Sequence, residues 1–315
     1  MGVDLSVIIP VFNEAESVGK LYAELKDVIG LHHYDAEIVF VDDGSTDATL
    51  KNLKRIASDD RTVKVVSFRR NYGQTPAMSA GIENAGGRII VTMDADLQND
   101  PHDIPAMIAL IESGYDLVSG WRKPRRDKFL VRTLPSMVAN HIIGIVTGVR
   151  LHDFGCTLKA YKADILKGIK LYGEMHRFIP VYAAGMGASI AEIQTHHRPR
   201  HYGKTHYGFM KTIKVLLDLL TVKFLADFST RPLHLFGGSG LMFMLASFFI
   251  GVYVLYEKFH LHVFAYRNPL LLLAVFLFLI GFELILIGLI AELIIRLYHE
   301  SMSNPVYTIK EKINL

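Results

Sequence analysis

The sequence predicts an α/β domain built on a mostly parallel sheet, followed by two membrane-spanning helices. Short runs rich in Val and Ile alternate with segments of helical periodicity over residues 1–205. Strands that are apolar throughout and separated by helices are typical of a parallel sheet covered on both faces. Two long apolar runs follow near the C-terminus and raise the mean hydropathy of the chain to +0.27.

The strand and helix patterns follow one another in order from the N-terminus. We expect strands at 5–12, 36–43, 63–68, 88–96 and 116–121, with helices between them, among them 14–29 and 47–58. Ligands in sheets of this kind bind at the carboxyl ends of the strands. Charged and amide side chains gather at these ends and mark the predicted site: Asn13, Glu14, Asp42, Asp43, Arg69 to Asn71, Asp94, Asp96 and Arg122.

The composition excludes some classes of protein. A net charge of +3 over 315 residues is too small for a dedicated nucleic-acid binder. Cys156 is the single cysteine, which excludes an intramolecular disulfide and fits a reducing compartment. The N-terminus lacks a basic start and its apolar run is short, so we expect no secretory signal peptide.

The two apolar runs predict a membrane hairpin over residues 232–298, with spans at about 232–256 and 269–295. The first span holds no Asp, Glu, Lys or Arg, and the second holds Glu283 and Glu292. Flanking Lys and Arg residues favour a cytoplasmic location for both ends of the hairpin, including the tail at 299–315. A carboxylate as deep as that of Glu283 should face another helix, within the chain or across a homo-oligomer.

Residues 206–231 lie between the soluble part and the first span. Polar positions at Lys211, Lys214, Asp218 and Thr221 recur at intervals of three and four, opposite an apolar face. This pattern predicts an amphipathic helix in the membrane interface. The alternative is a helix packed on the core of the soluble domain.

Asp94 and Asp96 end the strand predicted at 88–96. Residues two apart in a strand point to the same side, so these carboxylates, with Gln98 next to them, offer hard oxygen ligands for Mg²⁺ or Mn²⁺. A helix N-cap is the competing explanation, and it fits Asp100 before Pro101. Capping does not account for the two earlier acids.

The stretch "FVDDGSTDATL" ends the second predicted strand. Asp42 or Asp43 is expected to hydrogen-bond the base or ribose of a nucleotide, whereas Asp47 is placed to cap the following helix.

Four motifs in the first hundred residues, "VIIPVFNE", "VDDGSTD", "RNYGQTPAMSAG" and "DADLQ", together resemble the family 2 glycosyltransferases, which have the nucleotide-sugar fold called GT-A. The later motifs "DFGCTLKAY" and "RHYGKTHYGFMK", with the two C-terminal spans, resemble polyisoprenyl-phosphate glycosyltransferases. This group includes bactoprenol glucosyltransferases, aminoarabinose transferases of lipid A modification and dolichol-phosphate mannose synthases. The resemblance covers nearly the whole chain.

The resemblance implies roles for matching residues. Asp96 and Asp153 would be catalytic, with Asp153 a weak base or a group that orients the acceptor and the metal. Residues expected to bind the nucleotide-sugar are Pro10, Phe12, Glu14, Asp42, Asp43, Asp94 and Gln98. Metal ligands would be Asp94, Asp96 and Gln98, holding Mg²⁺ or Mn²⁺. The lipid phosphate would meet Arg122, Arg132, Ser136, Arg200 and Lys204.

The implied acceptor also shapes the expected mechanism. A lipid monophosphate has a second pKa near ~6, so its oxygen is already a nucleophile at neutral pH. A strong general base is then less needed than it is for a sugar hydroxyl. The protein must instead position two anions that repel each other and stabilise the leaving diphosphate. A single displacement would invert the anomeric carbon.

We therefore expect an inverting transferase that moves a hexose, with glucose as the first choice, from a UDP-sugar to undecaprenyl or another polyisoprenyl phosphate on the cytoplasmic leaflet of the cell membrane. Transfer of aminoarabinose or mannose is the alternative. A processive polysaccharide synthase is disfavoured, because Trp121 is the single Trp and lies in "SGWRK" rather than in a Q-x-x-R-W motif. A non-enzymatic scaffold or flippase subunit is the alternative of another class, and the intact pair of Asp94 and Asp96 argues against it.

Overall fold

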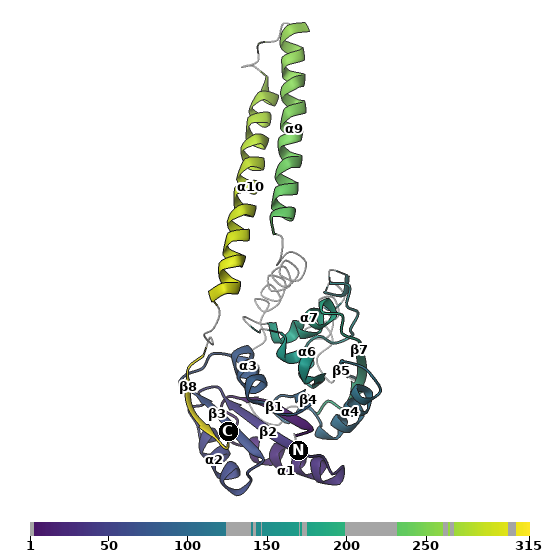
Figure 1. Cartoon of the computed structure of the whole chain (residues 1–315), viewed down its shortest axis with the longest axis vertical. Helices are drawn as coiled ribbons and strands as arrows, with labels where there is room; N and C mark the ends of the chain where they lie inside the picture. Colours follow the sequence, from purple (N-terminus) through teal and green to yellow (C-terminus); the bar gives the residue numbers. More distant parts are fainter. Residues whose placement is uncertain are drawn as a thin grey trace. The chain divides into compact units, whose positions relative to one another are not determined.

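The computed structural model describes residues 3–123, 140, 143–145, 147–169, 171, 175–198, 232–260, 264, 268–301 and 307–315. The chain divides into two compact units (Figure 1). Met1–Val222 and Pro305–Leu315 form the first, which contains a sheet with helices on both faces, and Lys223–Asn304 form the second, a helical hairpin.

An eight-stranded sheet with the order β7-β5-β6-β4-β1-β2-β3-β8 forms the core of the first unit. Its pairings show that β6 and β8 run antiparallel to their neighbours, whereas the other strands share one direction. The mostly parallel sheet predicted from the sequence is thus confirmed. The strands are β1 (Leu5–Val11), β2 (Ala36–Asp42), β3 (Val63–Phe68), β4 (Ile89–Thr92), β5 (Leu117–Arg122), β6 (Lys159–Lys162), β7 (Ile190–Thr195) and β8 (Ile309–Ile313).

Helices cover both faces of this sheet, because neighbouring residues of each strand point to opposite sides. In β1, Val7 and Ile9 join one buried cluster and Ile8 joins the other. The first cluster also takes in α1 (Val18–Leu31), α2 (Thr49–Asp59) and α4 (Ile104–Glu112), which begins after the short helix η1 (Pro101–Asp103). The second takes in α3 (Gln74–Asn84), α6 (Ala163–Lys167), η3 (Met175–Phe178) and α7 (Ile179–Gly185).

The strand order places the loops that concern function at one edge of the sheet. The carboxyl ends of the parallel strands meet there, and so do the amino ends of β6 and β8, which run the opposite way. The order reverses between β1 and β4, where a doubly wound sheet opens a crevice for ligands.

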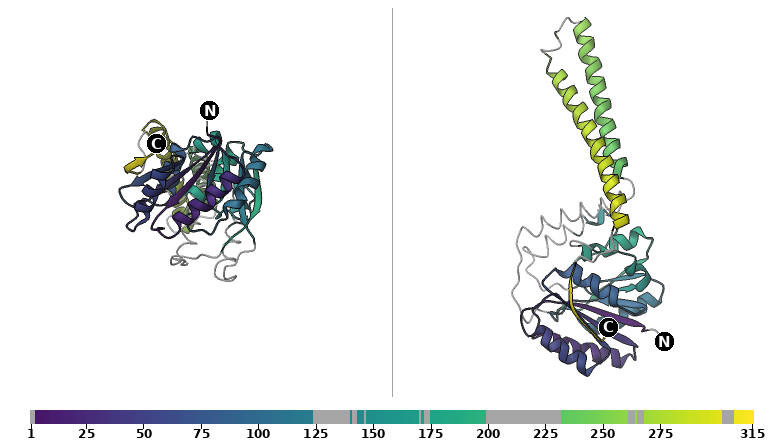
Figure 2. Two further views of the ribbon diagram at one scale, coloured as in Figure 1. Left: turned by 90° about the horizontal axis from the view of Figure 1, so that it is seen from below. Right: turned by 60° about the vertical axis from the view of Figure 1, so that its left-hand side comes forward.

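The C-terminal segment does not remain a simple tail. Residues Ile309–Ile313 form β8, which pairs antiparallel with β3 at the edge of the sheet. This strand is yellow in Figures 1 and 2 and lies beside the blue strands of the N-terminal half. The chain therefore returns to its first unit after the hairpin.

The second unit consists of α9 (Pro232–His260) and α10 (Pro269–Ser301), which pack antiparallel. The hydroxyl of Ser247 donates to the carbonyl oxygen of Ala274 at 2.6 Å. A Cβ added to Gly240 would lie 2.5 Å from the carbonyl oxygen of Gly281, so the two backbones touch there. These contacts are seven residues apart along each helix, as in the heptad spacing of helices that pack at a shallow angle.

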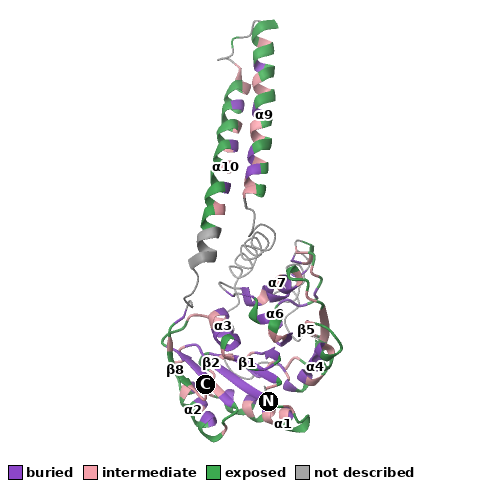
Figure 3. Ribbon diagram, viewed as in Figure 1, coloured by how far each residue is buried: buried purple, intermediate pink, exposed green. Residues whose placement is uncertain are grey.

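Leu233–His260 and Pro269–Ile294 are long and apolar enough to cross a bilayer, in agreement with the predicted spans. Only 17% and 11% of their apolar windows are buried, so neither has the burial of a core helix in a soluble protein (Figure 3). Glu283 is exposed on α10. The predicted contact of Glu283 with another helix is therefore not made within the described hairpin, and the contact across an oligomer stays a prediction. The predicted amphipathic segment 206–231 lies outside the described residues.

Candidate active site

The loops after β1 and β2 are hydrogen-bonded to each other at the edge of the sheet where the parallel strands end. The backbone N–H of Asn13 donates to the hydroxyl of Ser45 at 2.9 Å, and its side-chain oxygen accepts from the N–H of Thr46 at 2.9 Å. The N–H of Glu14 donates to the hydroxyl of Thr49 at 2.8 Å. Asn13 has a φ of 56°, a left-handed conformation that Asn tolerates better than most residues.

Of the residues predicted to meet the nucleotide here, Pro10 lies within β1, and Phe12 and Glu14 follow it. Phe12 is 44% exposed at the strand end, whereas Pro10 and Glu14 are half-buried. The carboxylate of Glu14 accepts a hydrogen bond from the hydroxyl of Ser17 at 2.6 Å. Asn13, one of the polar residues that mark the predicted site, joins the two loops, a role that the sequence analysis did not assign to it.

Asp42, the last residue of β2, and Asp43, which follows it, both have hydrogen-bond partners within the fold. Asp42 is buried and accepts from the N–H of Ser45 at 3.1 Å and from the hydroxyl of Ser67 at 2.8 Å. Asp43 accepts from the N–H groups of Tyr72 at 2.7 Å and Gly73 at 2.8 Å. Burial raises the pKa of Asp43, and these two donors act against that rise. The role of either acid toward a nucleotide stays a prediction.

The predicted cap of α2 is confirmed. Asp47 accepts from the N–H of Thr49, the first residue of α2, at 2.9 Å. The same carboxylate accepts from the N–H of Ala15 at 3.3 Å, which adds a further link between the two loops.

Asp94 and Asp96 lie beyond the end of β4, which stops at Thr92. The strand predicted to run to residue 96 is therefore too long. Leu97 adopts a φ of 62° and turns the chain, so that the N–H of Gln98 donates to Asp96 Oδ1 at 3.2 Å. The turn at Leu97, rather than a continued strand, therefore brings Asp96 and Gln98 together.

The electrostatics of this turn suit a divalent cation. Burial and the neighbouring charge of Asp96 raise the pKa of Asp94. Gln74, at the start of α3, donates to Asp94 Oδ1 at 2.7 Å. A cation between the carboxylates would relieve their repulsion. Among the described residues no group of three His, Cys, Asp or Glu side chains forms a metal site, and two carboxylates with substrate phosphates are a usual Mg²⁺ environment.

Arg122 and Asp153 form a bidentate ion pair at the end of β5. Asp153 is 0% exposed, and its Oδ2 accepts from Nε of Arg122 at 2.7 Å while Oδ1 accepts from Nη2 at 2.9 Å. The N–H of Gly155 also donates to Oδ1, at 3.1 Å. Both carboxylate oxygens therefore accept hydrogen bonds from the protein, which favours an orienting role for Asp153 over that of a base.

Glu192 supports this pair from β7. Its Oε1 accepts from the backbone N–H groups of His152 at 2.9 Å and Asp153 at 3.1 Å. The imidazole of His152 pairs with Glu192 Oε2 at 2.6 Å and stacks on Trp121 at 4.1 Å between ring centroids. Sequence reasoning missed Glu192, since the strand that carries it was not predicted.

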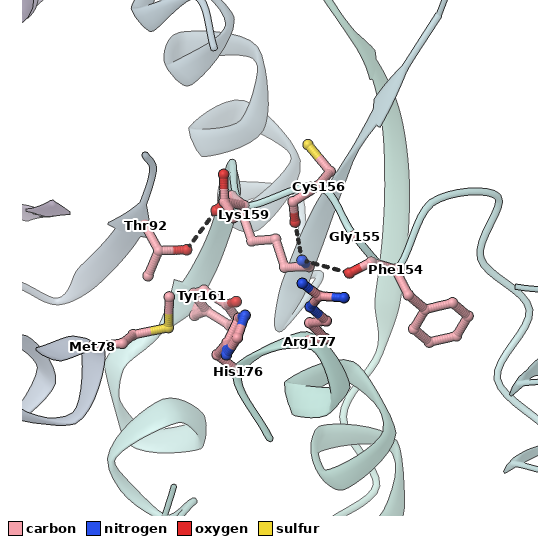
Figure 4. Close-up of a pocket in the computed structure, with 10 residues that line it drawn as sticks. Met78, Thr92, Phe154, Gly155, Cys156, Lys159, Tyr161, His176 and Arg177 are labelled. Carbon is pink, nitrogen blue, oxygen red and sulfur yellow. Dashed lines mark hydrogen bonds between the residues drawn. The ribbon is translucent and has the colours of Figure 1, made fainter. Parts of the chain in front are cut away.

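Lys159 is buried beneath the turn that follows Asp153. It is 2% exposed, and its Nζ donates to the carbonyl oxygens of Phe154, at 3.3 Å, and of Cys156 (Figure 4). Burial lowers the pKa of this ammonium group. The lysine thus fixes the backbone between Asp153 and β6. This lysine was assigned no role from the sequence.

Figure 4 shows the small cavity on which this lysine borders. His176 pairs with the hydroxyl of Thr75 at 2.7 Å, which ties η3 to the first turn of α3. The residues that line the cavity are Met78, Thr92, Phe154, Gly155, Cys156, Thr157, Lys159, Tyr161, His176 and Arg177.

The segment after β7 is hydrogen-bonded to the turn that carries Asp94, Asp96 and Gln98. The N–H of Arg198 donates to the carbonyl oxygen of Gln98 at 2.9 Å, and its guanidinium pairs with Glu24 at 2.7 Å and Asp100 at 2.8 Å. Asp100 also accepts from the N–H of His102 at 3.0 Å, which confirms its predicted capping role. The predicted acceptor residues Arg132, Ser136, Arg200 and Lys204 lie outside the described residues.

Comparison with known proteins adds a family and two relatives. The model of the family described as "Glycosyl transferase family 2" matches residues 6–170. Dodecaprenyl-phosphate galacturonate synthase from Rhizobium johnstonii is 43% identical over 312 residues, which cover 98% of this chain and 92% of the relative. Undecaprenyl-phosphate 4-deoxy-4-formamido-L-arabinose transferase from Proteus mirabilis is 34% identical over 313 residues, which cover 99% and 94%.

A solved structure has the same fold. Glucosyl-3-phosphoglycerate synthase from Mycobacterium tuberculosis, in complex with Mn²⁺, UDP and phosphoglyceric acid, matches with a TM-score of 0.53 at 19% identity. The match covers 70% of this chain and 78% of that one. At this identity the likeness concerns the fold, which is the GT-A fold expected from the sequence.

Proposed function

Because the chain belongs to glycosyl transferase family 2, we propose that it transfers a sugar from a nucleotide donor to a polyisoprenyl phosphate at a membrane surface. The observation that carries this proposal is the pairing of two features at one sheet edge. The acidic turn at Asp94 and Asp96 suits a cation with a diphosphate, and the guanidinium of Arg122, fixed by Asp153, suits an incoming phosphate. The relatives, matched through the hairpin as well, support the lipid acceptor.

We propose galacturonate as the first donor sugar to test and formamido-arabinose as the second. The order follows the identities to the two relatives, 43% and 34%. Glucose, the first choice from the sequence, has no support from either relative. UDP as the donor nucleotide rests on the resemblance of the motifs and on the fold relative that binds UDP.

For the donor we propose that Asp94, Asp96 and Gln98 hold Mg²⁺ or Mn²⁺. When bound, this cation would neutralise part of the charge that develops on the leaving diphosphate. Phe12 lies exposed at the neighbouring strand end, where an aromatic ring can stack on a base. Glu14 and Asp43 border the same loops.

For the acceptor we propose that Arg122 binds the lipid phosphate, together with Arg132, Ser136, Arg200 and Lys204. The ionised phosphate oxygen attacks the anomeric carbon directly and inverts it, while the nucleoside diphosphate leaves. No proton has to be removed from the acceptor, so the role of Asp153 is to orient Arg122. The bidentate geometry supports this role, because it fixes the guanidinium plane. Arg198, tied to Gln98, leads the chain directly to the segment that carries Arg200.

We propose that α9 and α10 cross the cell membrane as a hairpin, with the GT-A unit and both termini in the cytoplasm. Strand β8 supports this topology, because the segments before and after the hairpin belong to one folded unit. If the first unit folds on one side of a bilayer, the chain between Val222 and Pro305 must cross that bilayer an even number of times, as two spanning helices do.

The proposal is tested with the full-length chain in detergent or nanodiscs. Transfer from radiolabelled UDP-galacturonate, UDP-formamido-arabinose or UDP-glucose to undecaprenyl phosphate is measured with Mg²⁺, with Mn²⁺ and after chelation. We expect transfer from one donor, lost on chelation and in Asp96→Asn, and retained in the control Asp59→Asn, an exposed acid of α2. Absence of lipid-linked product from every donor, with folded protein, would refute the acceptor assignment and favour a scaffold.

A further inference from the structure

Tyr307, just before β8, joins two elements that border the donor side of the site. It is 7% exposed, and its ring stacks on Phe68, the last residue of β3, with centroids 4.7 Å apart and planes 20° apart. Its hydroxyl donates to Glu83 Oε2 near the end of α3 at 2.6 Å. One side chain therefore fixes the end of β3 against the end of α3.

The strand that follows is anchored along its whole length. Next to Tyr307, the carbonyl oxygen of Thr308 accepts from the N–H of Arg69 at 3.1 Å. Glu311 pairs with Lys54 of α2 at 2.7 Å. At the far end the amide of Asn314 donates to the carbonyl oxygen of Ala57 at 2.7 Å. Edge covering alone would need only the ladder with β3.

The loop that joins β3 to α3, residues 69–73, lies directly against the proposed donor site. Its N–H groups at Tyr72 and Gly73 hold the carboxylate of Asp43. Its backbone at Arg70 lies so close to Gly44 that a Cβ there would be 2.4 Å from the carbonyl carbon.

The chain leaves this loop at Gln74, which donates to Asp94 at 2.7 Å. The unit of β3, loop and α3 therefore contacts Asp43 and Asp94, two of the acids that the proposed donor site uses. The same unit is fixed from behind by Tyr307, through Phe68 and Glu83.

We propose that Tyr307 is a positioning residue of the nucleotide-sugar site, and that the strand following the membrane hairpin is a working part of that site. The hydrogen bond to Glu83 and the stack on Phe68 hold loop 69–73 in position at the edge of the sheet. The loop in turn positions the carboxylate of Asp43 and the side chain of Gln74. This inference rests on the proposed function only in naming the ligand, a nucleoside diphosphate with a divalent cation.

The test compares Tyr307→Phe with the matched control Glu311→Gln in the full-length protein. Tyr307→Phe keeps the ring stack and removes the donor to Glu83, whereas Glu311→Gln weakens a contact of the same strand that leads to α2. The dissociation constant for UDP with Mn²⁺, the donor and acceptor KM values, and hydrogen exchange at Tyr72 and Gly73 are measured. For Tyr307→Phe we expect about fivefold weaker UDP binding, a similar rise in donor KM and about fivefold faster exchange at these two amides, the size of one hydrogen bond.

We expect the acceptor KM to stay unchanged in Tyr307→Phe, and all four quantities to stay unchanged in Glu311→Gln. If UDP binding and hydrogen exchange at Tyr72 and Gly73 are unchanged in Tyr307→Phe, the inference is overturned. Strand β8 would then only cover the edge of β3. Exchange that accelerates equally throughout β1, β2 and β3 would also overturn it, since Tyr307 would then be only structural. If the wild-type chain binds UDP but transfers no sugar, the proposed function fails, and the UDP and exchange measurements still decide the role of Tyr307.

Discussion

Arg122 donates two parallel hydrogen bonds, of 2.7 and 2.9 Å, to the carboxylate of Asp153, which is fully buried. Removing either partner takes from the other the two charge-assisted hydrogen bonds of this pair. We expect Arg122→Met and Asp153→Asn each to lower the free energy of unfolding by about 3–5 kcal/mol. The double variant should lose much less than the sum, because the two residues contact each other and either single change already removes their shared interaction. Chemical unfolding of all four proteins in detergent checks this, and additive losses would contradict it.

The imidazole of His196 pairs with Asp103 Oδ1 at 2.7 Å, and this hydrogen bond raises the pKa of His196. The ion pair is therefore complete below the usual pKa of about 6.5 and is lost as the pH rises through the raised value. We expect Asp103→Asn to lower the pKa of His196 toward ~6.5, as read by NMR titration of labelled histidine. The control Asp59→Asn should leave it unchanged, and equal pKa values in wild type and Asp103→Asn would refute the assignment.

Gly44 has a φ of 71° and lies against the backbone of Arg70. We expect Gly44→Ala to destabilise the protein by more than about 1 kcal/mol, because both the conformation and the space are unfavourable for a Cβ. It should also weaken UDP binding, since Arg70 belongs to the loop that holds Asp43. Gly19→Ala is the control: nothing lies within 4 Å of the added Cβ in helix α1, so about 0.4–1 kcal/mol of stabilisation is expected. Thermal unfolding separates the two, and equal effects would argue against the close approach.

Gly240 and Gly281 bring the backbones of α9 and α10 into contact. We expect Gly240→Leu to separate the helices and to slow disulfide formation between Cys residues introduced at Ser247 and Ala274, in a background that lacks Cys156. Gly251→Leu is the matched control, because nothing lies within 4 Å of a Cβ at that glycine. Oxidative cross-linking followed by gel electrophoresis gives the rates. Undiminished cross-linking in Gly240→Leu would show that the hairpin does not depend on this contact.

Local patterns were sufficient for much of the fold. The apolar runs at β1, β2 and β3 are long and separated by clear helical periodicity, and both caps, Asp47 and Asp100, follow from their position before a helix. The acids that gather at the sheet edge follow from strand ends alone, since parallel strands must bring their carboxyl ends together.

Features that depend on distant parts of the chain were not predictable in this way. β6 is four residues long, and β8 finds its partner in β3 from the other end of the sequence. Arg122 and Asp153 were both expected in the site, but nothing local indicates that they bind each other across 31 positions. Glu192 and Lys159 act on the backbone near Asp153, and side chains that fix a backbone turn have no motif of their own.

The position of β8 in the chain also has a consequence for biogenesis. A ribosome makes both apolar helices before it makes the strand that completes the sheet, so the edge of β3 stays open until the hairpin has been synthesised. The hydrogen bond from Arg69 to Thr308 and the stack of Tyr307 on Phe68 form only after that point. The first unit is thus completed last along β3, an edge strand that its own N-terminal half contributes.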